Sequence, residues 1–491
     1  MSKRTRREFL EQSMFATAAA LAATSGTSVF ARQAGGRVSP NDTINVAVIG
    51  SGGRGGSHVG AFAGNQAMNT RITYMVDPDE MNGRRLAQQV AKRQGGAEPK
   101  VVRDMRQVFD DQSVHVVSIA TPNHWHSLAA IWAMQAGKDV YVEKPISHNV
   151  SEGRRVVEAA TKLNRICQVG TQCRSNPGTR DGISFIHGGG IGEVKVSRGL
   201  CYKPRGPIGP RGTYEVPASV DYDLWCGPAP KDPLTRRNLH YDWHWVWPTG
   251  NGDLGNQGIH QMDIARWALK EPGIGDAVIS YGGRLGYEDA GDTANTQVVV
   301  VPYGNRSLVF EVRGLQTGAL RDAKVGNIVE GEHGYVVFPS YTSSTAFDTT
   351  GRPIRTFKGG GDNLHYANFI AAVRSRRRQD LQADCAEGHP SSALCHLGNV
   401  SYLLGEKVTV EAATTRLGGL KVSDNVLETF ERTRQHLADN EVDLAATKLT
   451  MGAWLTIDQK TERFTNHDKA NTMLTRAYRA PYVVPADAAA I

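Results

Sequence analysis

The chain has 491 residues, which predicts roughly two to four domains at about 100–200 residues each. Its 40% hydrophobic and 21% charged residues are typical of a soluble globular protein and argue against disorder. Six cysteines without a Cys-x-x-Cys pair exclude a disulfide scaffold and a zinc ribbon. The net charge is +7, part of which lies in residues 1–31, and the remainder is too small to predict nucleic acid as a partner.

Residues 1–31 have the pattern of a twin-arginine export signal. Thr5–Leu10 carries the Arg-Arg pair, Met14–Ala23 is rich in alanine, and Val29–Ala31 ends in a small-x-small cleavage site. The alternatives are a disordered basic tail or a membrane anchor, but an anchor needs about 20 apolar residues and this run is shorter. We therefore expect a periplasmic protein whose mature chain starts near Arg32 and does not insert into a membrane. The twin-arginine route carries folded proteins, which indicates a cofactor acquired in the cytoplasm.

A glycine motif follows the first predicted strand, Ile44–Ile49. Gly50, Gly52 and Gly55 satisfy G-x-G-x-x-G, which gives a tight turn, close approach to a pyrophosphate, and close helix packing. The helix expected over 58–65 would point its free N–H groups at the phosphates. In a chain with 53 glycines the motif alone is weak, and the strand before it and the helix after it strengthen it. The segment therefore predicts a dinucleotide site.

The second predicted strand, Arg71–Val76, ends at Asp77. This carboxylate lies 22 residues after the last motif glycine, close to the usual spacing of the acid that binds the ribose. It accepts hydrogen bonds from the 2′-hydroxyl and repels a 2′-phosphate, so we favour NAD. Arg84 and Arg85 keep NADP as an alternative, and Asp77 has the further interpretation of a turn residue before Pro78.

Strands and helices continue to alternate up to residue 170, which predicts a doubly wound parallel sheet with ligands at the carboxyl ends of its strands. Two segments fall at these ends, Thr121–His126 and Glu143–Pro145. The further predicted elements are helix 79–94, a strand near 101, strand 115–120, helix 126–136, strand 139–142, helix 151–164 and strand 166–170.

The combination of G-x-G-x-x-G, Thr-Pro-Asn-x-x-His and Glu-Lys-Pro resembles the Gfo/Idh/MocA oxidoreductases, closely over residues 44–172 and more loosely beyond. The resemblance implies an α/β fold: an N-terminal Rossmann domain at 42–172 and a C-terminal α/β domain at 173–430 with a large, mostly antiparallel open sheet. A C-terminal extension would occupy 431–491. The resemblance also implies a nicotinamide cofactor, a carbohydrate substrate, and a homo-oligomer, a dimer or tetramer, that packs through the open sheet.

In this family the lysine of Glu-Lys-Pro lies beside the nicotinamide, and here it is Lys144. An ammonium at that place polarises a hydroxyl and stabilises alkoxide charge, whereas the alternative is a solvated surface lysine. In this family the peptide bond before the proline of Glu-Lys-Pro is often cis, so the resemblance implies a cis bond before Pro145. It also implies a set of cofactor-binding residues: Gly50, Gly52, Gly53, Arg54, Gly55, Asp77, Thr121, Pro122, Asn123, His126, Glu143 and Lys144.

Residues 204–233 contain seven prolines and predict a long irregular excursion, followed by an aromatic stretch at 240–247. Aromatic faces with interleaved polar groups suit sugars, so Trp243 and His244 are candidates for substrate binding. The alternative is a hydrophobic cluster beneath a long loop. His240 and His244 are four residues apart, but no third ligand has a diagnostic spacing, so we assign no metal.

A histidine in the second half completes the candidate catalytic set. The family pattern has an aspartate four residues before its histidine, and here His260 follows Asn256. Histidine can take the hydroxyl proton as hydride leaves, and asparagine can orient it but carries no charge. Asp253 or Asp263 could replace the missing aspartate. The alternative for His260 is a packed core histidine. We expect Lys144, Asn256 and His260 to be catalytic and to contact the substrate.

The rest of the second half predicts sheet strands and two helices. His389, which precedes the second helix, is expected to return to the cleft, and residues 430–491 carry no motif. The predicted strands are 278–283, 297–301, 308–313, 327–330 and 334–338, and the helices are 363–374 and 391–404.

Three functions follow from these patterns. The first is an exported NAD(P)-dependent oxidoreductase that acts on a sugar, polyol or glycoside hydroxyl and recycles a tightly bound cofactor. The second is an NAD-dependent glycoside hydrolase that works by oxidation, elimination and re-reduction, without the usual two carboxylates. The third is a non-catalytic sugar-binding protein, which Asn256 favours and which Lys144 and His260 disfavour.

Overall fold

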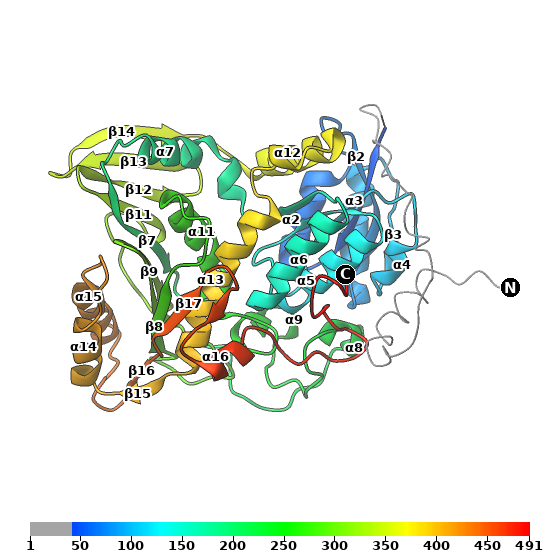
Figure 1. The fold of residues 1–491 in the computed structure, drawn as a ribbon. Coiled ribbons are helices and arrows are strands. Elements are labelled where there is room, and N and C mark those ends of the chain that lie inside the picture. Colours follow the sequence, from blue (N-terminus) through cyan, green and yellow to red (C-terminus); the bar gives the residue numbers. More distant parts are fainter. Residues whose placement is uncertain (1–41) are drawn as a thin grey trace.

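The computed structural model describes residues 42–491, so the predicted export signal lies outside the described residues. Two sheets form the two halves of the molecule, with a long helix between them (Figure 1). Within this part of the chain, no helix is both long and apolar enough to cross a membrane.

The first half is built on a parallel sheet of six strands in the order β3-β2-β1-β4-β5-β6. The strand order reverses between β1 and β4, and this is the switch point at which doubly wound folds bind ligands. All six strands predicted from the sequence are present, which confirms the predicted Rossmann sheet. Their bounds are β1 Ile44–Ile49, β2 Thr70–Val76, β3 Lys100–Val102, β4 Val116–Ile119, β5 Asp139–Val142 and β6 Cys167–Val169.

Helices cover both faces of this sheet because alternate residues of each strand point to opposite sides. Val46 and Val48 of β1 pack beneath α2 and α3, whereas Ala47 and Ile49 pack beneath α5 and α6. The helix bounds are α2 Gly53–Phe62, α3 Glu80–Arg93, α4 Arg106–Phe109, α5 Asn123–Gln135 and α6 Val150–Lys162. Both α2 and α5 begin earlier than predicted, so their first turns lie directly at the ends of β1 and β4.

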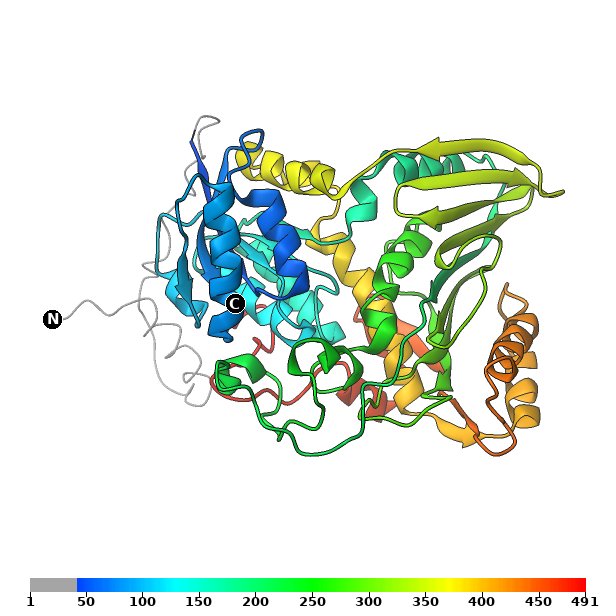
Figure 2. The same ribbon diagram turned by 180° about the vertical axis from the view of Figure 1, so that it is seen from behind.

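One helix of the second half returns to the first sheet. The predicted helix at 363–374 is present as α12, Asp362–Ser375, and its Tyr366, Phe369 and Val373 pack in the core with α2 and β1 (Figure 2). The chain therefore crosses between the halves more than once, and the first core includes residues from beyond the predicted boundary at 172.

The second half carries a large sheet whose main path is β14-β13-β12-β11-β7-β10-β9-β8-β16-β15, with β17 and β18 attached beside β8. Every pairing in it is antiparallel except that of β7 with β10, which confirms the predicted mostly antiparallel sheet. Its strands are β7 Val194–Tyr202, β8 Ala277–Gly283, β9 Thr296–Tyr303, β10 Arg306–Arg313, β11 Val325–Gly331, β12 Gly334–Ser340, β13 Ser343–Asp348, β14 Pro353–Lys358, β15 Glu406–Val408, β16 Leu449–Met451, β17 Leu455–Asp458 and β18 Arg463–Phe464.

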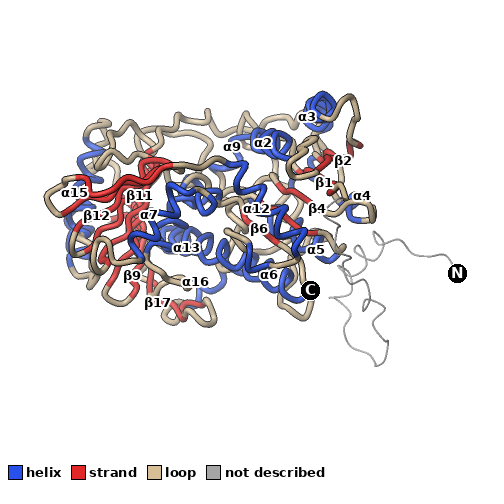
Figure 3. Tube along the Cα trace, turned by 90° about the horizontal axis from the view of Figure 1, so that it is seen from above, coloured by secondary structure: helices blue, strands red, loops and turns tan. Residues whose placement is uncertain are grey.

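Helices also lie on both sides of the second sheet (Figure 3). On the side toward the first half are α7 Pro177–His187, α11 Gly258–Ala268 and α13 Cys385–Leu403, and α13 also contacts α6. The outer side carries α14 Val410–Gly418 and α15 Val426–Ala438. The short elements are α8 Tyr222–Cys226, α9 Leu239–Asp242, α10 Gly252–Gly255, α16 Asp468–Thr472 and the 3₁₀ turns η2 Gln172–Ser175, η3 Trp243–Trp245 and η4 Arg378–Asp380.

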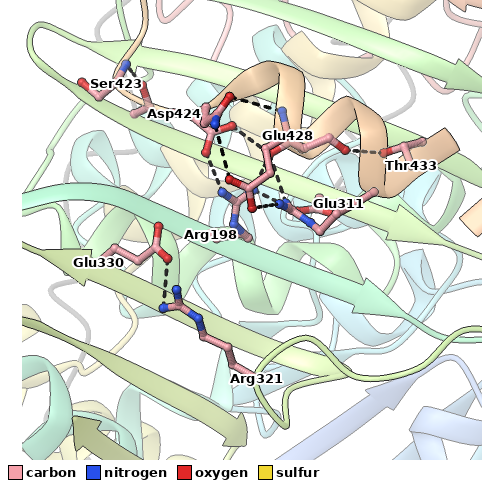
Figure 4. A network of polar contacts seen from close by, with 12 residues as sticks. Arg198, Glu311, Arg321, Glu330, Ser423, Asp424, Glu428 and Thr433 are labelled. Carbon is pink, nitrogen blue, oxygen red and sulfur yellow. Dashed lines mark hydrogen bonds and ion pairs between the residues drawn. The ribbon is translucent and has the colours of Figure 1, made fainter. Parts of the chain in front are cut away.

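A buried ionic network joins α15 to the outer face of the sheet (Figure 4). Arg198 of β7 donates to Glu311 of β10 at 2.8 Å and to Asp424, just before α15, at 2.5 Å. Arg432 of α15 donates to the same Glu311 at 2.9 Å. Because each buried charge has an opposite partner, the helix can cover a charged part of the sheet without leaving an uncompensated ion.

The segment predicted as a separate extension at 431–491 is part of the second half. The boundary at 430 falls inside α15, and β16 and β17 both pair with β8. These strands are only three or four residues long, which is too short for a local periodicity to mark them. Beyond α16 the chain runs back to the first half, where Tyr482 and Val484 join the core beneath α5.

Candidate active site

The glycine loop after β1 has the geometry of a dinucleotide cradle. Gly50 has φ +95°, and a Cβ there would lie 2.5 Å from the carbonyl oxygen of Ala120. A Cβ on Gly55 would lie 2.1 Å from the carbonyl oxygen of Gly50, so α2 packs on the loop only with glycine at both places. At Gly52 a Cβ would meet nothing within 4 Å, and no side chain caps α2 there. The first N–H groups of α2 are thus left for a ligand.

The carboxylate of Asp77 lies against this loop at the end of β2. It accepts hydrogen bonds from the backbone N–H of Ser51 at 2.6 Å and of Asp79 at 2.8 Å. Burial raises the pKa of Asp77 to about 6. The residue therefore shapes the turn and also lines the ligand cavity, so the two interpretations of Asp77 are compatible.

The two arginines that kept NADP open both have partners in the protein. Arg84 forms an ion pair with Glu80 on the surface, and Arg85 donates to the carbonyl oxygen of Ser51 at 2.9 Å. Both guanidinium groups therefore bind oxygens of the protein, whereas Asp77 is among the residues that line the cavity. The site therefore fits a 2′-hydroxyl, the group by which NAD differs from NADP.

A cavity of about 260 Å³ lies between the two halves of the molecule, with the glycine loop on one side. It brings together nearly all predicted site residues, which lie up to about 200 positions apart in the sequence. Gly55 and His260 are the two predicted residues that do not line it. The predicted residues that line it are Gly50, Gly52, Gly53, Arg54, Asp77, Thr121, Pro122, Asn123, His126, Glu143, Lys144, Trp243, His244 and Asn256.

A segment of the proline-rich excursion covers the nucleotide end of this cavity. The backbone N–H of Asp221 donates to Pro78 at 2.8 Å, directly beyond Asp77. The indole of Trp125 donates to the carbonyl oxygen of Leu224 at 3.0 Å, and Leu224 and Trp225 line the cavity. Sequence reasoning missed this cover, since an irregular segment carries no periodic pattern and its contacts are all distant in sequence.

Lys144 lies at the other end, where the two halves meet. Its Nζ donates to the backbone carbonyl oxygen of Asn256 at 2.7 Å, and the Lys144–Pro145 peptide bond is cis, as the resemblance implies. Burial lowers the pKa of Lys144 to about 8. Asn256, which stands where the family has an aspartate, therefore binds the lysine through its backbone carbonyl. With this pKa the lysine can exchange a proton near neutral pH.

Beneath Lys144, the carboxylate of Glu143 is enclosed by donors. Arg54 donates to it at 2.7 Å, His58 lies at 3.2 Å and Gln172 donates at 3.3 Å. Burial would raise the pKa of Glu143, but the charge of Arg54 and the hydrogen bond from His58 hold it well below its usual range. Arg54 also binds Asp362 of α12, so two of its nitrogens hold protein carboxylates, although the resemblance implies cofactor binding.

His126 lines the cavity, but both nitrogens of its ring have partners in the protein. Its ring is buried, with Nδ1 2.6 Å from the carbonyl oxygen of Pro145 and Nε2 2.8 Å from that of Thr121. Both nitrogens face backbone oxygens, so the ring ties the two motif loops together and offers no free nitrogen to a cofactor. Two hydroxyls beside the glycine loop, Ser51 Oγ and Thr121 Oγ1, have no hydrogen-bond partner within residues 42–491 and fit a polar ligand.

His260, on α11, is recessed behind the cavity wall with only 7% of its surface exposed. Its Nδ1 has no hydrogen-bond partner in the described part of the chain, and its ring lies 5.1 Å from that of Tyr341. Burial and the charge of Lys144 hold the pKa of His260 well below 6.5. The ring is therefore neutral in this arrangement.

The prediction that Asp253 or Asp263 replaces the missing aspartate is wrong. Arg205 donates to both oxygens of Asp253 at 2.9 and 2.8 Å, and Arg174 donates to both oxygens of Asp263 at 2.7 and 2.9 Å. Each carboxylate is saturated by a guanidinium, so neither orients the imidazole of His260.

The expectation that His389 returns to the cleft is also wrong. His389 lies on α13, where its Nε2 contacts the carboxylate of Glu462 at 2.9 Å, and it is not among the residues that line the cavity. Since α13 begins at Cys385, this histidine is inside the helix and faces the C-terminal segment.

The aromatic stretch both packs and lines the cavity. Trp243 is buried in a small core with Trp225 and Leu239, and the ring of His244 stacks on it with centroids 3.6 Å apart. His240 binds Asp79 at 2.8 Å, so it does not pair with His244 around a metal. Across residues 42–491, no group of three or more His, Cys, Asp and Glu side chains could hold a metal ion.

Two family models match the chain. The first, described as an oxidoreductase family with an NAD-binding Rossmann fold, matches residues 44–171. The second, described as the C-terminal alpha/beta domain of the same oxidoreductase family, matches residues 211–437. Together they cover most of the chain and both sides of the cavity.

Curated relatives are similar over different lengths. Levoglucosan dehydrogenase of Pseudarthrobacter phenanthrenivorans is 30% identical over 48% of this chain and 54% of its own length. The match thus spans about half of that protein. Inositol 2-dehydrogenase 2 of Saccharopolyspora erythraea is 26% identical over 76% of this chain and 96% of its own. A glycosyl hydrolase family 109 protein of Solibacter usitatus is 28% identical over 40% of this chain and 45% of its own.

Among solved structures, levoglucosan dehydrogenase in complex with NADH and levoglucosan superimposes with a TM-score of 0.54 and 20% identity. The superposition covers 72% of this chain and 96% of that chain, and it shows a shared fold. The family models and this fold agree with the cradle, the Glu-Lys-Pro loop and the two-sheet architecture described above. The chain belongs to the Gfo/Idh/MocA family of oxidoreductases, and its first half is an NAD-binding Rossmann domain.

Proposed function

We propose that this protein moves hydride between NAD and the hydroxyl-bearing carbon of a sugar, polyol or glycoside. The observation that carries the proposal is the position of the Lys144 ammonium, in the same cavity as the glycine cradle and 2.7 Å from the carbonyl oxygen of Asn256. The printed activities of the relatives, on levoglucosan and inositol, support a polyhydroxylated substrate.

The residues divide the work by their charge. When bound, NAD supplies the hydride acceptor. Lys144, cationic below its pKa of about 8, polarises the substrate oxygen and stabilises the negative charge that develops on it. His260 is neutral and is the candidate acceptor of the hydroxyl proton. His260 itself does not line the cavity, whereas Asn256, four residues before it in the chain, does.

We further propose that NAD stays bound between turnovers. The cover over the nucleotide is held from behind by residues 476–484, here called the strap. Arg479 donates to the carboxylate of Asp223 at 2.7 Å and to its backbone carbonyl at 2.8 Å, and the hydroxyl of Tyr482 donates to the same carboxylate at 3.1 Å. The ring of Tyr482 lies 5.4 Å from that of Trp125.

Periplasmic localisation by twin-arginine export is proposed from the pattern of residues 1–31. Outside the cytoplasm little free NAD is available for exchange, so a retained cofactor has to be re-reduced or re-oxidised by the substrates themselves. Fractionation of cells that express the chain with Arg6 and Arg7 intact, or both changed to lysine, tests the export step.

Assay of the released nucleotide tests the central proposal. The purified protein is denatured and the supernatant is measured for NAD. About one nucleotide per chain is expected, and sugars offered without added acceptor should change the ratio of NADH to NAD. A protein with no nucleotide, and with no tight binding of added NAD, would be the non-catalytic sugar-binding alternative.

The hydrolase alternative has one specific support, the similarity to a glycosyl hydrolase family 109 protein. It uses the same oxidised intermediate to expel a leaving group and then returns the hydride. Aryl glycosides offered without acceptor separate the two reactions. Release of the phenol supports hydrolysis, whereas accumulation of a keto sugar supports oxidoreduction.

A homo-oligomer, a dimer or tetramer, also stays a proposal. The helices α14 and α15 cover the outer face of β8, β9 and β10. Packing through the sheet would therefore use the part formed by β11 to β14. Light scattering after size exclusion measures the mass of the assembly and decides between one, two and four chains.

A further inference from the structure

A second groove lies beside the active-site cavity, and Tyr241 lines both. The groove has a volume of about 600 Å³ and is formed by the proline-rich excursion together with α9 and η3. Its principal side chains are Arg205, Arg237, Asn238, Tyr241, Asp242 and Trp245. Neither the glycine cradle nor Lys144 contributes to it, so the proposed hydride transfer leaves this groove unexplained.

The wall between cavity and groove is held in one arrangement. Arg205 binds both oxygens of Asp253, its guanidinium lies 5.0 Å from the ring centre of Trp245, and it donates to the hydroxyl of Tyr241 at 3.2 Å. Tyr241 keeps 48% of its surface exposed. A fixed and exposed aromatic ring is the usual platform for the C–H face of a sugar, and little side-chain entropy is lost when it is covered.

The groove begins close to the reacting end of the cavity. Asp253 is in α10, and the residue that follows this helix, Asn256, accepts the hydrogen bond from Lys144 at 2.7 Å. Arg205 is therefore connected to the lysine through Asp253 and one short helix. A ligand that spans both spaces would place one end at Lys144 and the other beyond Tyr241.

The charged side chains that line the groove are balanced in sign. Arg205 is neutralised by Asp253, and the other lining arginine, Arg237, is matched in number by Asp242. A phosphate or a uronate would need an excess of positive charge, which this set does not supply. The amide of Asn238, the guanidinium of Arg237 and the carboxylate of Asp242 instead offer both donors and acceptors, as neutral hydroxyl groups require.

We propose that this groove binds a second sugar ring, so that the substrate is a glycoside with at least two rings and its reacting ring lies at Lys144. The inference rests on the proposed function and narrows its substrate class. The ring beyond Tyr241 does not react. Its contacts raise the affinity for the larger substrate and orient the reacting ring.

The test compares a methyl glycoside with a disaccharide that has the same reacting sugar. For the wild-type protein we expect kcat/KM to be at least about tenfold higher for the disaccharide, which corresponds to about 1.4 kcal/mol of extra binding. In the double variant Arg237→Ala with Asn238→Ala this ratio should fall to between one and three. The matched control is Arg180→Ala, an exposed arginine on α7, in which the ratio should keep its wild-type value.

Two measurements keep the groove and the proposed reaction separable. Equal kcat/KM for both glycosides in the wild-type protein, or an unchanged ratio in the double variant, would overturn the proposal that the groove binds a second sugar ring. If neither glycoside is turned over, disaccharide binding is followed by tryptophan fluorescence with NADH present. Disaccharide binding that is weaker in the double variant than in the wild-type protein then supports the second-ring site and refutes the proposed hydride transfer. Equal binding in the two proteins overturns the second-ring site. Thermal unfolding confirms that the variants, at two exposed positions, are folded.

Discussion

Two buried glutamates, Glu143 in the first half and Glu311 in the second, have similar surroundings and different uses. Both are nearly inaccessible, and positively charged or hydrogen-bonding neighbours hold the pKa of each below its usual range, that of Glu311 at about 2. Glu143 immediately precedes Lys144 in the chain, and both residues line the cavity. Glu311 lies between β7, β10 and α15, where its partners are the three arginines 198, 313 and 432.

The difference shows that a perturbed pKa does not by itself locate an active site. What distinguishes Glu143 is its neighbour Lys144, with a pKa of about 8, in a cavity that a ligand can enter. Around Glu311 the charges bind one another and fix a helix to a sheet (Figure 4). The first cluster should therefore respond to mutation in activity, and the second in stability.

The largest effect is expected for Glu311→Gln. The substitution leaves Arg198 and Arg432 without their shared carboxylate in a buried place, which should cost about 3–5 kcal/mol of unfolding free energy. Urea unfolding followed by circular dichroism measures the loss. At temperatures where the variant is folded, its kcat should match the wild-type value. A stable variant with low kcat would reverse the assignment of the two clusters.

Next comes Lys144→Ala, which tests the first cluster. We expect kcat to fall at least about 100-fold, because an electrostatic partner of the developing alkoxide is lost. The unfolding free energy should change much less than in Glu311→Gln, since Lys144 is partly exposed at a cavity wall. Turnover close to the wild-type rate would remove Lys144 from the mechanism.

A pH profile sharpens the role of the same lysine. Its pKa of about 8 means that the ammonium is present below pH 8 and is lost above it. If the cation stabilises the alkoxide, kcat/KM should fall above pH 8 by up to about tenfold per pH unit. The variant Lys144→Arg keeps its charge at pH 9, so its residual activity should lack this alkaline limb. A rate that rises above pH 8 would instead identify neutral Lys144 as the base.

The smallest effect is expected for the strap. Arg479 and Asp223 are both partly exposed, so Arg479→Ala should cost at most about 1 kcal/mol and speed NAD release roughly twofold to fivefold. Competition of bound NADH against excess NAD, followed by NADH fluorescence, measures the release rate. Arg463→Ala, at an exposed arginine of β18, is the matched control. A release rate equal to that of the control would show that the strap does not hold the cover.

Much of the first half was predictable because its signals are local. The alternation of strands and helices and the glycine spacing depend on neighbours a few residues away, and the six strands were all predicted. The second sheet was predicted less completely. Its β7, β13 and β14 were missed, and β16 and β17 are so short that only their pairing with strands distant in sequence or across a turn defines them.

By itself, the sequence determined the fold class, the dinucleotide cradle at Gly50 and Gly55, and the presence of a lysine at a strand end. These follow from spacing and from the unique conformational range of glycine. Only the tertiary structure decided that Asp253 and Asp263 belong to arginines and that His260 is recessed. It alone placed Tyr241 between two ligand spaces. Those outcomes depend on contacts between charged groups and rings that are far apart in the sequence, and a local sequence pattern cannot predict such contacts.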